Sequence, residues 1–147
     1  MREILFRGKR IDNGEWVLSG NIIRLIPENG EDLIFIQALS EPCTCCHDEK
    51  DNIIAFEKGI FYKVDTKTVG QYTCLKDKNG KRIFEGDIVK TDKFSEPNKQ
   101  YIIKYDLQFG AFIGQDRYNI YFVTFDCDSG EVEVIGNIHD KPELLEK

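Results

Sequence analysis

One stretch, FYKVDTKTVGQYTCLKDKNGKRIFEGDIV at residues 61–89, decides how this chain is organised. It is a series of local structure signals. Asp65 or Thr66 supplies a side-chain oxygen that caps a short helical turn, and Gly70 is suited to end it. An Asn-Gly turn and a glycine bend follow, the second leading into an apolar strand. The stretch therefore predicts strands joined by tight turns, and it contains no catalytic constellation.

The same kinds of signal extend in both directions. Asn13-Gly14 predicts a hairpin near the start of the chain, because an Asn-Gly pair tolerates the positive φ of a two-residue turn. Short strands spaced by turns are typical of a small barrel or sandwich. Pro142 indicates a C-terminal helical turn. The predicted strands outside the central stretch are Glu3–Gly8, Trp16–Leu18, Asn21–Ile26, Leu33–Leu39, Ile53–Phe56, Tyr101–Tyr105, Ala111–Ile113, Tyr118–Phe125 and Glu131–Ile135.

Composition places the chain among soluble globular proteins of one or two small domains. It has 147 residues, 41% hydrophobic and 31% charged, with 12% aromatic residues. The first strand shows only three consecutive apolar residues, too few for a signal peptide, and no apolar run has the roughly 20 residues that span a membrane. We therefore expect a cytoplasmic protein with no membrane association. The five cysteines are odd in number and three of them cluster within residues 43–46, so they do not suggest a secreted disulfide framework.

Charge is distributed unevenly along the chain. The net charge is −6, and residues 76–104 form the one basic segment, with 8 basic and 5 acidic side chains. Residues 1–75 carry 9 basic and 12 acidic groups, and residues 105–147 carry 3 and 9. An acidic body repels phosphate, so the whole chain disfavours non-specific nucleic-acid binding.

The strand predicted at 118–125 is apolar on both faces. In an alternating strand one face is polar. Here one face carries Tyr121, Val123 and Phe125, and the side chains on the opposite face are equally apolar. Such a strand must be covered on both sides, by the rest of the chain or by a second subunit. We therefore expect a homo-oligomer with Tyr121 and Phe125 as the candidate contact.

Three blocks of sequence resemble the YopX-like family of small phage and prophage proteins. They are REILFRGK at 2–9 with NGEWV at 13–17, the central stretch at 61–89, and VIGNIHDKPELL at 134–145. Two positions differ from the family pattern, in which proline often stands at Thr66 and glycine at Cys74. The resemblance implies a β-rich α+β protein: a small N-terminal α+β part at 1–75, then an SH3-like β-barrel with a C-terminal tail at 76–147. It supplies no catalytic residue.

One cluster has the side chains that zinc prefers. Cys43, Cys45, Cys46 and His47 provide three thiols and an imidazole within five residues. Their spacing is unfavourable, because adjacent cysteines in an extended chain point apart and zinc sites usually place two residues between paired cysteines. A zinc-stabilised protein stays one alternative, and a surface loop with reduced thiols is the other.

The basic segment provides a second alternative function. Lys78, Lys81, Arg82 and Lys90 lie near a predicted hairpin with Phe84 interleaved, and small barrels bind single strands through charge and aromatic stacking. The opposing interpretation is that these cations solvate an exposed hairpin and protect a strand edge.

No nucleophile motif, paired catalytic carboxylates or phosphate loop was found, so we expect neither an enzyme nor a cofactor. The leading hypothesis is a non-enzymatic accessory protein that binds a host or phage protein.

Overall fold

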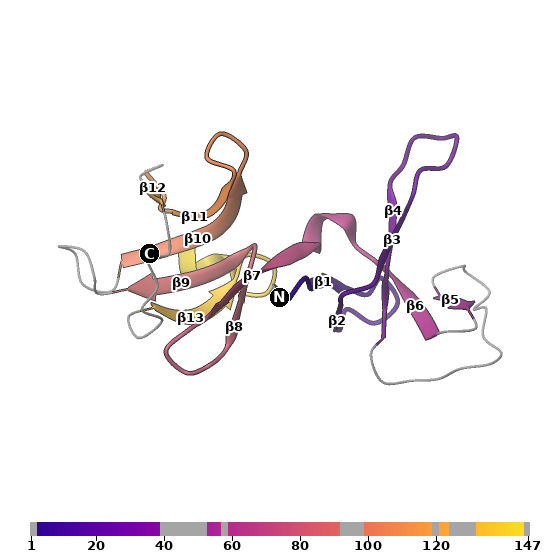
Figure 1. Cartoon of the computed structure of the whole chain (residues 1–147), viewed down its shortest axis with the longest axis horizontal. Helices are drawn as coiled ribbons and strands as arrows, with labels where there is room; N and C mark the ends of the chain where they lie inside the picture. Colours follow the sequence, from indigo (N-terminus) through magenta and orange to yellow (C-terminus); the bar gives the residue numbers. More distant parts are fainter. Residues whose placement is uncertain are drawn as a thin grey trace. The chain divides into compact units, whose positions relative to one another are not determined.

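The computed structural model describes most of the chain as two compact units. The described residues are 3–38, 53–56, 59–91, 99–118, 121–123 and 132–145. The units comprise Met1–Gln71 and Tyr72–Lys147, so the division falls within strand β7. The boundary expected from the sequence was after residue 75. Figure 1 shows the strands of both units, coloured along the sequence.

The first unit is built from two groups of antiparallel strands. A hairpin of β1 and β2 pairs through β1 with the start of β7, where Phe6 lies opposite Gln71. The other strands form a sheet in the order β3-β4-β6-β5. The elements are β1 (Phe6–Lys9), β2 (Trp16–Ser19), β3 (Ile22–Leu25), β4 (Leu33–Gln37), β5 (Ile53–Phe56), β6 (Gly59–Val64) and the 3-10 turn η1 (Thr66–Thr68).

Hydrophobic burial joins the two strand groups of the first unit. Val17, Ile36 and Val64 form its core, with half-buried apolar side chains around them. Gly8 allows β1 to approach β6, since a Cβ at this position would lie 3.0 Å from Val64 Cβ. A larger residue there would push the strands apart, so this glycine has a packing role.

The predicted cap and hairpin turn are both present. The Asp65 side chain accepts a hydrogen bond from the Lys67 backbone N–H at 3.0 Å and caps η1. Gly14 has φ of +73°, as the Asn-Gly signal requires. The strand predicted at Glu3–Gly8 is shorter at its start in the structure: β1 begins at Phe6, and of the two residues before it Ile4 is 56% exposed while Leu5 is buried.

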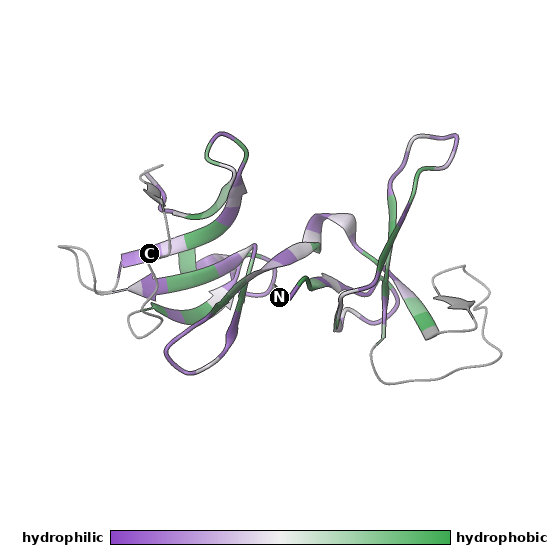
Figure 2. Ribbon diagram, in the orientation of Figure 1, coloured by the Kyte–Doolittle hydropathy of each residue, from purple (hydrophilic) through white to green (hydrophobic). Residues whose placement is uncertain are grey.

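The second unit contains a five-stranded antiparallel sheet in the order β12-β11-β10-β9-β13, and β7 pairs with β8. Figure 2 shows hydrophobic residues along the middle of β9 and β10, where Val89, Tyr101 and Ile103 are buried. The elements are β7 (Gly70–Lys76), β8 (Arg82–Phe84), β9 (Asp87–Thr91), β10 (Lys99–Asp106), β11 (Ala111–Gln115), β12 (Tyr121–Val123), β13 (Val132–Asn137) and the 3-10 turn η3 (Pro142–Leu145).

The protein is β-rich, as expected. Within the described residues the sheets are open and none closes into a barrel, and the helical elements are two 3-10 turns, η1 and η3. None of these described helical segments is long and apolar enough to cross a membrane.

Cys74 departs from ordinary strand geometry. Its φ is +70°, and the pairing of β7 with β8 shifts register between Tyr72 and Lys76. A bulge of this kind prefers glycine at the left-handed position. The structure therefore explains why glycine suits this position in the family pattern, and Cys74 adopts a conformation that is unfavourable for a residue with a Cβ.

Candidate functional site

The turn between β7 and β8 is held by a buried carboxylate. Asp77 is 4% exposed; its Oδ1 accepts hydrogen bonds from the backbone N–H groups of Asn79 and Lys81, at 2.8 and 2.9 Å. Its Oδ2 accepts from the Val134 N–H at 3.1 Å, which ties the turn to β13. Burial raises the pKa of Asp77, but these three hydrogen bonds outweigh it and the net pKa is lowered.

The predicted basic residues lie on this turn and on the strands β8 and β9 that follow it, and two of them are paired. Lys78 Nζ lies 2.5 Å and Lys90 Nζ 3.2 Å from Glu133 Oε2. Hydrogen bonds from these two lysines lower the pKa of Glu133, so this carboxylate stays charged and balances part of their charge. Arg82 lies over the Tyr72 ring at 5.7 Å. Lys81 is exposed on the turn.

The other predicted site residues fall largely outside the described chain. Cys43, Cys45, Cys46 and His47 lie outside the described residues, and so does Phe125. Tyr121 begins β12, and only its backbone is described. Within the described ranges no group of three or more His, Cys, Asp or Glu side chains is arranged to hold a metal ion.

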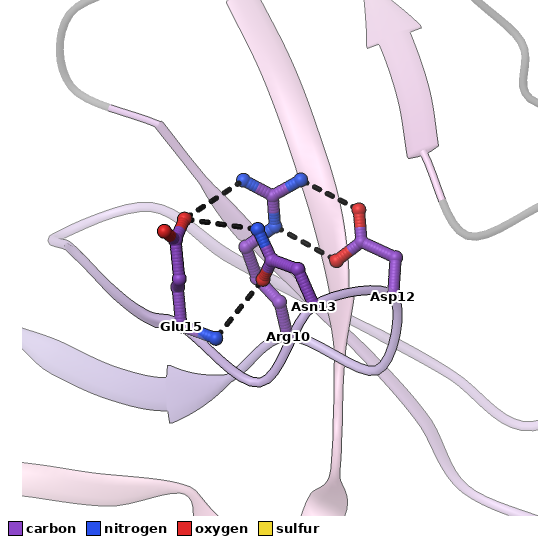
Figure 3. Close-up of polar contacts among 4 residues, drawn as sticks. All are labelled: Arg10, Asp12, Asn13 and Glu15. Atoms are coloured by element: carbon purple, nitrogen blue, oxygen red, sulfur yellow. Dashed lines mark hydrogen bonds and ion pairs between the residues drawn. The ribbon is translucent and has the colours of Figure 1, made fainter.

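The β1–β2 hairpin carries a polar network that Figure 3 shows in close-up. Arg10 donates from Nε to Asp12 Oδ1 at 2.9 Å and from Nη2 to Asp12 Oδ2 at 2.5 Å. Its guanidinium stacks on the Tyr62 ring at 3.6 Å. The paired hydrogen bonds raise the pKa of Arg10 and lower that of Asp12. Asp12 balances the charge of Arg10, and Glu15 Oε2 lies 3.9 Å from Arg10 Nη1. We therefore interpret this network as one that stabilises the hairpin.

A second cation–aromatic group lies on the same hairpin. The Arg7 guanidinium is 4.8 Å and the Lys9 ammonium 5.5 Å from the centre of the Trp16 ring. Trp16 is half-buried. The two cations lie two residues apart on β1, so they share one face of the hairpin. Their contacts with the Trp16 ring stabilise the pairing of β1 with β2.

Of the four large apolar side chains that are exposed in the described part of the second unit, three lie at the end of the β10–β11 hairpin. We call residues 105–112 the apolar hairpin end. Leu107 is 89% exposed, and Tyr105 and Phe109 are 44% and 49% exposed. In Figure 1 the turn projects beyond the strands that it joins. Phe112 supports Tyr105 by an edge-on ring contact with centroids 5.2 Å apart.

This hairpin end has a defined backbone. Asp106 Oδ1 accepts hydrogen bonds from the N–H groups of Gln108 and Phe109, at 2.8 and 3.0 Å. Gly110 supplies the positive φ of +61° that closes the turn. At its base Glu85 Oε1 accepts from the Tyr105 N–H at 3.2 Å. The apolar side chains are thus displayed on a pre-ordered turn.

Sequence reasoning treated residues 106–110 only as a separator between strands. The signal that it passed over is the presence of Leu107 and Phe109 in a turn, where apolar side chains have no neighbouring layer to cover them.

These features define a class: a two-unit, antiparallel β protein in which several buried or paired polar side chains hold turns and several exposed apolar side chains lie on a hairpin end. The chain belongs to the YopX protein family, whose model matches residues 5–146. This confirms the resemblance found in the sequence.

Among solved structures, the chain is similar to the crystal structure of protein EF1440 from Enterococcus faecalis. The two share 25% sequence identity with a TM-score of 0.53, and the match covers 99% of each chain. No curated protein matches the chain.

Proposed function

We propose that this chain is a non-enzymatic, cytoplasmic accessory protein of a phage or prophage that acts by binding another protein. The apolar hairpin end carries the proposal. It presents Tyr105, Leu107 and Phe109 to solvent on a turn fixed by hydrogen bonds. Exposed apolar groups cost free energy in a free protein, and aromatic side chains are common anchors of protein interfaces.

The roles of the buried polar side chains support a non-enzymatic protein. Thr73 Oγ1 donates to the Ile83 carbonyl at 2.8 Å, and Asp87 Oδ2 accepts from the Phe84 N–H at 2.8 Å. Asp77 holds the β7–β8 turn. Each of these groups fixes backbone geometry, whereas a catalytic acid or base must reach a substrate.

We also propose that the second unit is an SH3-like barrel. The support is the connection between its two strand groups: the Lys78 N–H donates to the Val132 carbonyl at 2.9 Å, and Asp77 accepts from Val134. These contacts bring the β7–β8 turn to the edge strand β13, which is the joint that a small barrel requires.

Nucleic-acid binding through Lys78, Lys81, Arg82 and Lys90 ranks second. The pairing of two of these lysines with Glu133 reduces the local positive charge available to phosphate. Homo-oligomerisation through Tyr121 and Phe125 also stays a prediction. Light scattering of Tyr121→Glu and Phe125→Glu variants tests it, and an unchanged mass would count against this strand as the contact.

The test of the main proposal is a pull-down of the tagged chain from a lysate of its bacterial host, in nuclease-treated and untreated halves. A host or phage protein retained equally in both halves supports protein binding. Material that disappears on nuclease treatment would replace the proposal with nucleic-acid binding.

A further inference from the structure

We infer that the apolar hairpin end is an insertion element that enters a concave apolar pocket, with a basic rim, on a partner protein. This inference rests on the proposed function and names the surface that performs it. Leu107 is the leading side chain because it is the most exposed, and Tyr105 and Phe109 flank it.

Pre-ordering favours insertion over loose association. A flexible loop loses conformational freedom on binding, at about 0.5–1.5 kcal/mol for each immobilised side chain, in addition to the backbone cost. Here Asp106 already fixes the turn through two backbone hydrogen bonds, and Phe112 already supports Tyr105. The hairpin end therefore binds with less ordering cost than an unstructured apolar loop.

The exposed area argues against a second copy as the occupant. Large apolar side chains present about 150–250 Å² each, so the exposed fractions of these three residues give about 350 Å² per copy. Two hairpin ends facing each other would bury about 700 Å², whereas stable interfaces bury roughly 1,200–2,000 Å². A pocket instead surrounds the same side chains, and its walls supply the remaining area.

Charge indicates the character of the pocket's rim. Two carboxylates, those of Glu85 and Asp106, stand at the base of the hairpin end. Lys104, which directly precedes the hairpin end in sequence, donates from Nζ to Gln115 Oε1. Residues 72–147 carry 11 basic and 14 acidic side chains, a net charge of −3. A rim of lysine or arginine complements this surface and steers the encounter.

Site-specific photo-crosslinking tests this inference. p-Benzoylphenylalanine replaces Leu107, Phe109 or, as a matched exposed apolar control in the first unit, Ile26, which is 65% exposed. The tagged chains are expressed in the bacterial host and irradiated, and the cross-linked peptides are mapped by mass spectrometry. Circular dichroism checks that each variant folds. The identified protein is then titrated against the unmodified chain and against Leu107→Ala and Asp106→Ala variants.

The inference predicts cross-links from positions 107 and 109 to apolar residues of one protein, with lysine or arginine beside them. It also predicts an affinity about 30-fold lower for Leu107→Ala, and a weaker loss for Asp106→Ala, which keeps the apolar side chains but loosens the turn. Cross-links to a second copy, to a flat or acidic surface, or from position 26 alone would overturn it.

The two proposals fail in different ways. A partner retained in the pull-down but cross-linked only from position 26 would leave protein binding intact and remove the hairpin end from it. Absence of any captured protein, together with absence of cross-links, would overturn both.

Discussion

Replacing Asp77 with asparagine tests the central joint of the second unit. The carboxylate is 4% exposed and accepts three backbone N–H groups. Asparagine keeps one acceptor oxygen, which can serve Asn79 and Lys81, but it turns an NH₂ group towards the Val134 N–H. A charge-assisted hydrogen bond is lost and a buried donor is left unsatisfied. We expect the free energy of unfolding to fall by about 2–3 kcal/mol at pH 7.

The effect depends on pH in a defined direction. The folded-state pKa of Asp77 lies below the ordinary value of 3.8, so the unfolded chain binds more protons in the window between the two pKa values. The stabilising contribution is complete above the ordinary value and is lost as the pH falls through the folded-state pKa. The difference in free energy of unfolding between wild type and Asp77→Asn should therefore become smaller as the pH falls, because Asp77 of the wild type becomes protonated and loses its charge.

The assay is urea unfolding followed by circular dichroism, from neutral pH to about pH 3, combined with amide hydrogen exchange at Val134. Asp65→Asn is the control, because Asp65 is an exposed helix cap and asparagine caps equally well. We expect that variant to lie within about 0.5 kcal/mol of wild type. A similarly small loss for Asp77→Asn at pH 7, or a gap that stays constant with pH, would refute the reasoning.

Three further predictions concern packing, strain and charge. Cys74→Gly should stabilise the protein by about 0.5–1 kcal/mol in urea unfolding, because glycine accepts φ of +70° and this gain exceeds the entropic cost of glycine. A loss of stability would show that the backbone of Cys74 is not strained. Gly8→Val should destabilise the first unit by about 1–3 kcal/mol, because the valine Cβ would lie 3.0 Å from Val64. Urea unfolding monitored by Trp16 fluorescence measures this loss, and an unchanged unfolding midpoint would show that the close approach of the strands does not require glycine. Glu133→Gln should change stability by less than about 1 kcal/mol and strengthen any binding of single-stranded DNA at low salt, because it releases Lys78 and Lys90. Unchanged DNA binding in a fluorescence-anisotropy titration would remove these two lysines from a nucleic-acid site.

Local features were predictable because their causes lie within a few residues. The Asp65 cap needs only a side-chain oxygen two residues before a backbone N–H. The Asn-Gly turns at Gly14 and Gly80 need only a glycine with positive φ, and both have it. Short strands between such turns followed from the same signals, although β10 and β11 each extend beyond the predicted bounds.

The candidate site was less predictable than the turns around it. The basic residues could be located near a hairpin from sequence, but the pairing of Lys78 and Lys90 with Glu133 could not, because that carboxylate comes from β13, more than forty residues after Lys90. The apolar hairpin end was overlooked because exposure is a property of the folded surface. An apolar residue in a turn can equally be covered by a distant segment.

The sequence by itself determined a β-rich chain of short strands, the positions of its tight turns and caps, and its membership in the YopX family, since these depend on residue type and short spacing. Only the tertiary structure decided that β1 pairs with β7, that Asp77 reaches Val134, and that Leu107 stays in solvent. Pairing between distant strands depends on register and on competition among many apolar surfaces, and the chain resolves that competition only when all of them pack at once.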